Sequence, residues 1–287
     1  MRVHIALTVV VFSFVSQTRA QTEAVRNVLD ATQTALGGAT ALDRVRTVRA
    51  EGRSVRRVGP LTLGSRVTLT LARPDRYLLT EALSVGGRSA ETATGFNGDK
   101  VIQRATGPDG TRLDPGSFAQ APIAGRSDPT AAAALRRELR LLLLGCFADA
   151  FDAARTAVDY RGTAEAPDGK ADALHLVFAD GSDATLFTDA LTHLPLMASW
   201  EAPDTLAPLR AGGRGAAISS PPSSPSSPSP LPIVEHRLYF SDYRRVGDVR
   251  WPFVIRRSVQ GELLEEIRFD RISINPAVDP KVFAVDR

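Results

Sequence analysis

Residues 249–274 read Val-Arg-Trp-Pro-Phe-Val-Ile-Arg-Arg-Ser-Val-Gln-Gly-Glu-Leu-Leu-Glu-Glu-Ile-Arg-Phe-Asp-Arg-Ile-Ser-Ile, the most regular stretch of this 287-residue sequence. Its second half alternates Glu266, Arg268 and Asp270 with Ile267, Phe269 and Arg271. A period of two is typical of a half-buried strand, and a glycine between two such runs favours a hairpin. The stretch therefore predicts two antiparallel strands that turn at Gly261. A third strand is expected before them at 234–243, with a turn at 246–248.

The same period of two occupies most of the chain upstream. Strands are predicted at 66–71, 76–85, 92–96, 99–105, 157–161, 173–179, 184–189 and 194–201. Two segments instead have helical spacing, 21–36 and 129–144, each followed by glycine, and a short turn of helix is expected at 39–45. Each helix has one apolar face that must be covered. The predicted fold class is mainly β (α+β): a single strongly curved antiparallel sheet of about ten strands, forming a half-open β-barrel closed by helices.

The first twenty residues have the pattern of a secretory signal peptide. Arg2 and His4 precede an apolar run over 5–15, and Thr18-Arg19-Ala20 places small residues where cleavage before Gln21 requires them. The run is about 11 residues long, whereas a membrane span needs roughly 20. An uncleaved N-terminal anchor is the alternative. The sequence predicts removal of residues 1–20 and a soluble periplasmic protein.

Composition narrows the class further. Hydrophobic residues make up 43% and charged residues 23%, with a formal net charge of +3. Acids are interspersed among the bases, whereas nucleic-acid binders gather basic charge on one face, so no nucleic-acid partner is expected. The single cysteine, Cys146, allows no internal disulfide and lies far from the cleavage site, so no lipid anchor is expected there. Its apolar surroundings predict a small buried hydrophobe.

A Pro/Ser-rich segment interrupts the pattern at about 203–232 and is predicted to be disordered, because its composition cannot bury enough apolar surface. The segment after it, 233–287, is too short to bury a core alone. We therefore expect one domain over 21–287 with an insertion, and not two domains.

Catalytic patterns are nearly absent. His175, His193 and His236 have no metal-ligand spacing, and no Gly-x-Ser-x-Gly motif occurs. Glu265 and Glu266 are adjacent in a strand, so they should face opposite sides of the sheet. The sequence predicts no enzyme, no cofactor and no metal site. The alternative is a polar constellation assembled only by the fold, such as His175 or His236 beside an acid.

One cluster of arginines lies near the start of the first predicted sheet region. At a period of two, Arg49, Arg53 and Arg57 share a face. They could bind an anionic head group, a lipid phosphate or an acidic partner. The other interpretation is an ordinary solvated strand face.

Residues 239–253, Tyr-Phe-Ser-Asp-Tyr-Arg-Arg-Val-Gly-Asp-Val-Arg-Trp-Pro-Phe, resemble the strand–turn–strand pattern of LolA/LolB-like periplasmic proteins. Residues 272–283, Ile-Ser-Ile-Asn-Pro-Ala-Val-Asp-Pro-Lys-Val-Phe, are similar to the closing segment of that family. The resemblance implies a half-open β-barrel closed by helices, with an apolar cavity for acyl chains. It also implies a place in lipoprotein sorting and outer membrane biogenesis, where members carry lipoproteins or sense misplaced lipoproteins or lipids.

The predicted function is an exported periplasmic carrier or sensor that binds lipid, or the acyl chains of lipoproteins, in an apolar cavity. The inward positions expected to line it are Val67, Leu69, Leu71, Leu135, Leu139, Leu142, Leu174, Leu176 and Phe178. The alternative is a protein-binding envelope-stress sensor without lipid transport, which would grip an envelope membrane protein through the sheet or the arginines. A monomer is expected in both.

Overall fold

The computed structural model describes residues 10–58, 61–85, 88–98, 100–113, 129–147, 157–166, 169–204 and 231–285. The helical elements are α1 (Val10–Leu36), α2 (Ala39–Asp43), α4 (Pro129–Leu144) and the 3-10 turn η1 (Pro280–Phe283). The strands are β1 (Thr47–Val58), β2 (Leu61–Ala72), β3 (Arg76–Val85), β4 (Arg88–Asn97), β5 (Lys100–Thr106), β6 (Ala157–Ala166), β7 (Gly169–Val177), β8 (Asp183–Asp189), β9 (Pro195–Pro203), β10 (Ile233–Val246), β11 (Val249–Val259) and β12 (Glu262–Ile274). The fold is mainly β, as predicted.

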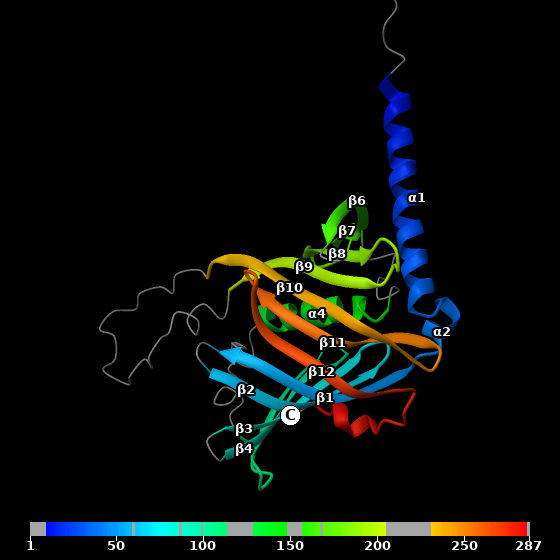
Figure 1. The fold of residues 1–287 in the computed structure, drawn as a ribbon. Coiled ribbons are helices and arrows are strands. Elements are labelled where there is room, and N and C mark those ends of the chain that lie inside the picture. Colours follow the sequence, from blue (N-terminus) through cyan, green and yellow to red (C-terminus); the bar gives the residue numbers. More distant parts are fainter. Residues whose placement is uncertain are drawn as a thin grey trace, which may run out of the picture.

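All twelve strands form one antiparallel sheet, in the order β5-β4-β3-β2-β1-β12-β11-β10-β9-β8-β7-β6 (Figure 1). The predicted hairpin at 249–274 is confirmed, with Val259 opposite Glu262. Strand β1 pairs with β12, placing Val48 opposite Ile274, so parts of the chain that are distant in the sequence meet in the middle of the sheet. The sheet is not closed, because β5 and β6 lie at its two ends.

Helix α1 ends at Leu36, where the sequence places its end. Gly37 follows with φ 132°, and a Cβ at this position would overlap the carbonyl oxygen of Asp248, beside the β10–β11 turn. Glycine is therefore needed for close approach as well as for backbone conformation. At its other end, α1 begins at Val10 and continues through the predicted cleavage position at Ala20.

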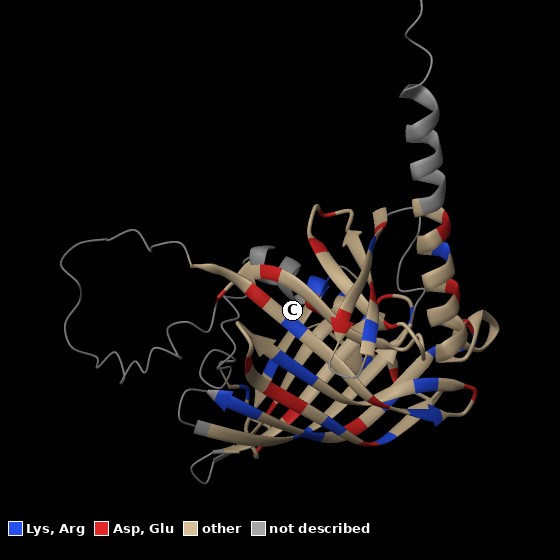
Figure 2. Ribbon diagram, turned by 45° about the horizontal axis from the view of Figure 1, so that its top comes forward, with Lys and Arg blue, Asp and Glu red and all other residues tan. Residues whose placement is uncertain are grey.

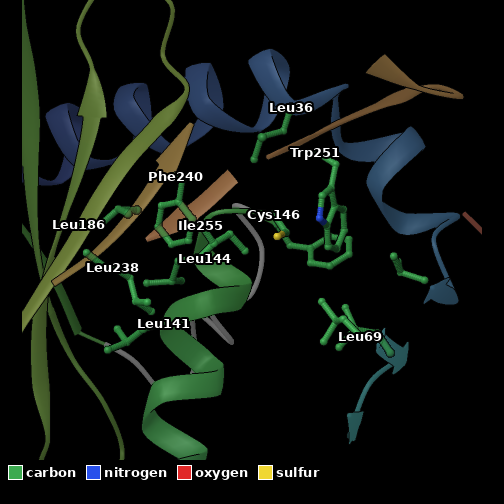
Figure 3. Packing of buried hydrophobic residues seen from close by; sticks show 14 of the residues in the cluster. Leu36, Leu69, Leu141, Leu144, Cys146, Leu186, Leu238, Phe240, Trp251 and Ile255 are labelled. Atoms are coloured by element: carbon green, nitrogen blue, oxygen red, sulfur yellow. The ribbon is translucent and has the colours of Figure 1, made fainter. Parts of the chain in front are cut away.

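The main core lies between α1, α2, α4 and one face of the sheet. Leu141 and Leu144 of α4 are fully buried, and Figure 3 shows them near Leu238 and Phe240 of β10. Trp251 on β11 is 1% exposed and meets the Phe147 ring edge-on, with 5.5 Å between ring centroids. The apolar faces predicted for the helices are thus covered by the sheet.

Two sequence predictions lie partly outside the described residues: the start of the signal peptide at 1–9 and positions 205–230 of the Pro/Ser-rich segment. Signal-peptide cleavage and disorder of the insertion stay predictions. In the part of the chain that the structure describes, no helix combines the length and apolarity needed to cross a membrane.

Gly95 provides a test of how tightly neighbouring strands approach. A Cβ at Gly95 on β4 would overlap the carbonyl oxygen of Tyr77 on β3, whereas a Cβ at Gly64 on β2 meets nothing within 4 Å. We expect Gly95→Ala to lower the free energy of unfolding by about 1–3 kcal/mol, the usual cost of overpacking. Gly64→Ala should change it by less than about 0.5 kcal/mol. Urea unfolding of both variants measures the difference, and equal effects would contradict this packing.

Candidate functional site

A hollow of about 90 Å³ lies between α4 and the sheet. It is lined mainly by apolar side chains, with charged groups at one side. The lining residues are Tyr77 and Leu79 of β3, Thr94 of β4, Glu138, Leu139 and Leu142 of α4, Leu238 of β10, Ile255 and Arg257 of β11, and Glu265 and Ile267 of β12. Strands from both halves of the sheet therefore contribute to one site.

The predicted cavity residues fall into three groups. Six are buried in the main core cluster: Val67, Leu69, Leu71, Leu174, Leu176 and Phe178. Leu139 and Leu142 are partly buried and line the hollow itself. Leu135 lies in α4, but its side chain is outside the described residues. The structure thus brings eight predicted residues into one core, of which two border open space.

The size of the hollow limits what it can hold in this conformation. A cavity of about 150 Å³ accommodates a benzene molecule, and sites for drug-sized ligands usually have about 300–1,000 Å³. About 90 Å³ is too small for an acyl chain. With α4 in its present position, side chains fill most of the space beneath it.

A cluster of charged side chains adjoins the hollow. The Arg56 guanidinium donates to Glu265 Oε1 from Nη2 at 2.7 Å and from Nε at 3.2 Å, and to Glu81 Oε1 from Nη2 at 3.0 Å. The Ser54 hydroxyl donates to Glu265 Oε1 at 2.8 Å. This cluster ties β1 to β12 and reaches across to β3.

Arg257 extends the cluster to α4. It forms an ion pair with Glu138 of the helix, and its Nε lies 3.8 Å from Glu265 Oε2. The side chain of Glu265 is only 8% exposed, whereas those of Arg257 and Glu138 are 35% and 25% exposed. The inner carboxylate is therefore enclosed, and the contact between helix and sheet is accessible from solvent.

The pKa values within the cluster follow from burial and pairing. Burial alone would raise the pKa of Glu265, but Arg56 and Arg257 outweigh it and hold that pKa below its ordinary value. Burial opposes charge on Arg257 as well, yet Glu138 and Glu265 raise the pKa of its guanidinium. The Tyr77 hydroxyl has a raised pKa, mainly because it is buried and next because Glu138 is near. Glu265 and Arg257 are therefore both charged at neutral pH.

The end of α4 is held by a separate set of contacts. The Tyr243 hydroxyl donates to the carbonyl oxygen of Gly145 at 2.8 Å, and the Arg73 guanidinium lies 4.8 Å from the centre of the Phe147 ring. Cys146 is 2% exposed, as its surroundings predicted, and burial raises the pKa of its thiol. Such a thiol is a packing group and a poor nucleophile.

The outward face of β1 carries the predicted arginines. Arg49, Arg53 and Arg57 are all exposed, as is Val55 on the same face, while Ala50, Gly52 and Ser54 are buried. Arg49 Nε donates to Glu51 at 2.8 Å, and Arg53 Nη2 donates to Asp270 on β12 at 3.1 Å. Figure 2 shows charges of both signs on these strands. The shared face is present, and two of its arginines are already paired with acids.

The histidines contribute to local contacts. His175 lies 3.1 Å from Asp183 and 3.2 Å from Arg161, while His236 stacks on Trp200 with ring centroids 5.5 Å apart. The His236 Nε2 atom is buried. No group of three His, Cys, Asp or Glu side chains suited to a metal ion occurs within the described ranges.

The two carboxylates of Glu265 and Glu266 do face opposite sides, as the strand geometry predicted. Glu265 joins the buried cluster, whereas Glu266 accepts hydrogen bonds from Arg256 at 2.6 Å and Arg268 at 2.5 Å on the outer face. The sequence analysis did not single out Arg56, whose side chain points inward to Glu265, whereas that of the neighbouring Arg57 is exposed.

An open antiparallel sheet with a helix packed over a small apolar hollow describes the class of fold. A DUF1329 family protein from Desulfovibrio piger has a similar structure, with a TM-score of 0.51 and 10% identity, covering 91% of this chain and 97% of that one. A putative outer membrane lipoprotein-sorting protein domain from Vibrio parahaemolyticus matches with a TM-score of 0.48 and 11% identity, over 89% and 95% of the chains. A LolA superfamily protein from Nitrosomonas europaea gives 0.48 and 10%, over 88% and 97%.

The structures that match thus include a LolA superfamily protein and a lipoprotein-sorting domain, the kind of protein that residues 239–253 and 272–283 resemble. At this identity the likeness concerns the fold alone. No family model and no curated protein matches the sequence.

Proposed function

We propose that this protein is an exported, non-enzymatic carrier or sensor of the periplasm that binds an acyl chain between α4 and the sheet. The observation that carries the proposal is the apolar hollow lined jointly by α4 and by strands from both halves of the sheet. Burial of apolar surface can supply most of the binding free energy of such a ligand, because each CH₂ group removed from water contributes about 0.8 kcal/mol.

The architecture that this function requires is a half-open barrel with α4 as its closing helix. Strands β4 and β10 both line the hollow, although five strands separate them in the sheet. In a flat sheet with about 4.8 Å between neighbours they would lie roughly 29 Å apart. The width of a hollow of about 90 Å³ is far smaller than this separation between the two strands. Its lining therefore supports a sheet that bends around the helix.

Binding then requires α4 to move away from the sheet. The side chains of Leu139 and Leu142 line the hollow from the helix, and the helix is held by the Glu138–Arg257 ion pair. A chain of about 16 carbons gains roughly 12 kcal/mol on full burial at about 0.8 kcal/mol per CH₂, which offsets the loss of these contacts. The present conformation is the closed, unloaded one in this proposal.

Purification without detergent, followed by solvent extraction and mass spectrometry, tests the proposal. We expect co-purified lipid, or saturable uptake of a fluorescent fatty acid by protein that has been stripped of lipid. Leu142→Glu, which places a charge in the hollow, should abolish uptake. Leu191→Glu is the matched control, because Leu191 is 87% exposed and distant from the lining residues in the sequence. Absence of both co-purified lipid and uptake would refute acyl binding.

A second candidate function, binding of an acidic segment of an envelope protein, is favoured by the outer face of the sheet. On the part of this face formed by β1, β2, β11 and β12, arginines outnumber acids, with Arg49, Arg53, Arg57, Arg66, Arg256, Arg268 and Arg271 against Glu51, Glu266 and Asp270. A protein partner that survives delipidation and is lost on triple Arg→Glu substitution at 49, 53 and 57 would support this function over lipid transport.

A further inference from the structure

Helix α4 offers the sheet one carboxylate followed by apolar side chains. Glu138 pairs with Arg257, and Leu139 and Leu142 continue along the wall of the hollow. Leu141 and Leu144 of the same helix are fully buried in the main core. This sequence of groups, a single anion and then a run of hydrocarbon, is the chemical outline of a fatty acid.

The helix satisfies Arg257 only in part. Glu138 contacts the Nη2 atom, while the Nε atom is buried and makes no hydrogen bond to any residue that the structure describes. Glu265 Oε2 lies 3.8 Å from Nε, which is beyond hydrogen-bond distance. A carboxylate that is not fixed to a helix can accept from Nε and Nη2 together, the two-bond geometry that arginine and carboxylate favour.

The pairing of Arg257 selects the same kind of ligand. The sheet contributes Arg56 and Arg257 together with Glu81 and Glu265, and α4 contributes the further anion Glu138. If α4 leaves, Arg257 loses its main partner, and a half-buried guanidinium without a partner is costly. A free carboxylate restores that pairing with the same charge. An esterified or amide-linked acyl chain cannot, because it carries no anion at its end.

We propose that the ligand is a free fatty acid, whose carboxylate takes the place of Glu138 on Arg257 while its tail takes the place of the α4 leucines. In this arrangement α4 acts as an internal competitor of the ligand. The proposal rests on the acyl-binding function above and restricts it to a chain with a free carboxylate.

Competition for a bound fluorescent fatty acid tests this, using palmitate and methyl palmitate at pH 7 with the full chain. We expect palmitate to bind about tenfold or more tightly than its methyl ester, as a charge-assisted hydrogen bond implies. Arg257→Met should remove that preference, while Glu138→Gln should tighten palmitate binding because the competitor is weakened. Arg256→Met is the matched control, since Arg256 lies next along β11 and pairs outward with Glu266 at 2.6 Å; the preference should persist.

The outcomes separate the two proposals. Equal binding of acid and ester by the wild-type protein would overturn the carboxylate inference and leave acyl binding intact. Failure of both probes to bind would overturn acyl binding itself. If Arg257→Met is unfolded by circular dichroism, the Glu138→Gln variant decides, and unchanged or weaker palmitate binding by it would overturn the competitor role of α4.

Discussion

Replacing Glu265 by Gln should lower the free energy of unfolding by about 3 kcal/mol or more, because removing one charge from a buried ion-pair cluster leaves its partners uncompensated. Arg56 would lose its shortest contact, and Arg257 would keep only Glu138. Urea unfolding at pH 7 measures the effect. Glu266→Gln is the matched control, because Glu266 lies on the outer face and exposed pairs contribute about 0–1 kcal/mol.

We also expect Glu265→Gln to change the pH dependence of the free energy of unfolding. The pKa of Glu265 is lower in the folded protein than its ordinary value, so its pairing stabilises the fold above that ordinary value and is lost as pH falls through the folded value. Wild-type stability should therefore drop in acid more steeply than that of Glu265→Gln. Parallel pH profiles for the two proteins, or a Glu266→Gln variant that is equally destabilised at pH 7, would contradict the role given to the cluster.

Truncating Trp251 to Ala should cost about 3–5 kcal/mol, the range for removing a large buried aromatic side chain. Trp251 is 1% exposed and packs edge-on against Phe147, directly beyond the end of α4. Its loss removes core volume and loosens the attachment of the helix to the sheet. Thermal unfolding gives the stability change, and limited proteolysis should show earlier cleavage within 129–147.

Leu191→Ala is the comparison for Trp251→Ala, since Leu191 is 87% exposed and its truncation should change stability by less than about 0.5 kcal/mol. A Trp251→Ala protein that keeps wild-type stability would show that this region is less tightly packed than the structure indicates. A destabilised variant with unchanged proteolysis would show that Trp251 supports the sheet without anchoring α4.

Local elements were predictable because their signals are local. Alternation over 249–274 gave β11 and β12 nearly to the residue, and Gly37 marked the end of α1. The pairing of β1 with β12 has no comparable signal, because nothing within either strand names a partner so far away in the chain. A single sequence shows which residues of a strand face the core more clearly than it shows which strand pairs with which.

The charged part of the site could have been predicted from the alternation of inward and outward residues along β11. Arg257 follows Trp251, Phe253 and Ile255 at a period of two, so a cation occupies a position in line with core residues. An ionisable group at an inward position requires a partner, which is a signal for a buried pair. The partner itself, Glu138, lies on a helix whose docking the sequence does not specify. Alternation likewise identifies inward leucines without saying which of them pack and which border the hollow.

The meeting of β1 and β12 also has a temporal consequence. Strand β1 is synthesised before the other strands and β12 after them, so β1 can pair with β12 only once β12 has left the ribosome. Until then the leading meander carries an unsatisfied hydrogen-bonding edge, a template for mispairing with other chains. The exposed edge of β1 is therefore the place where mispairing of a partly synthesised chain is expected to begin.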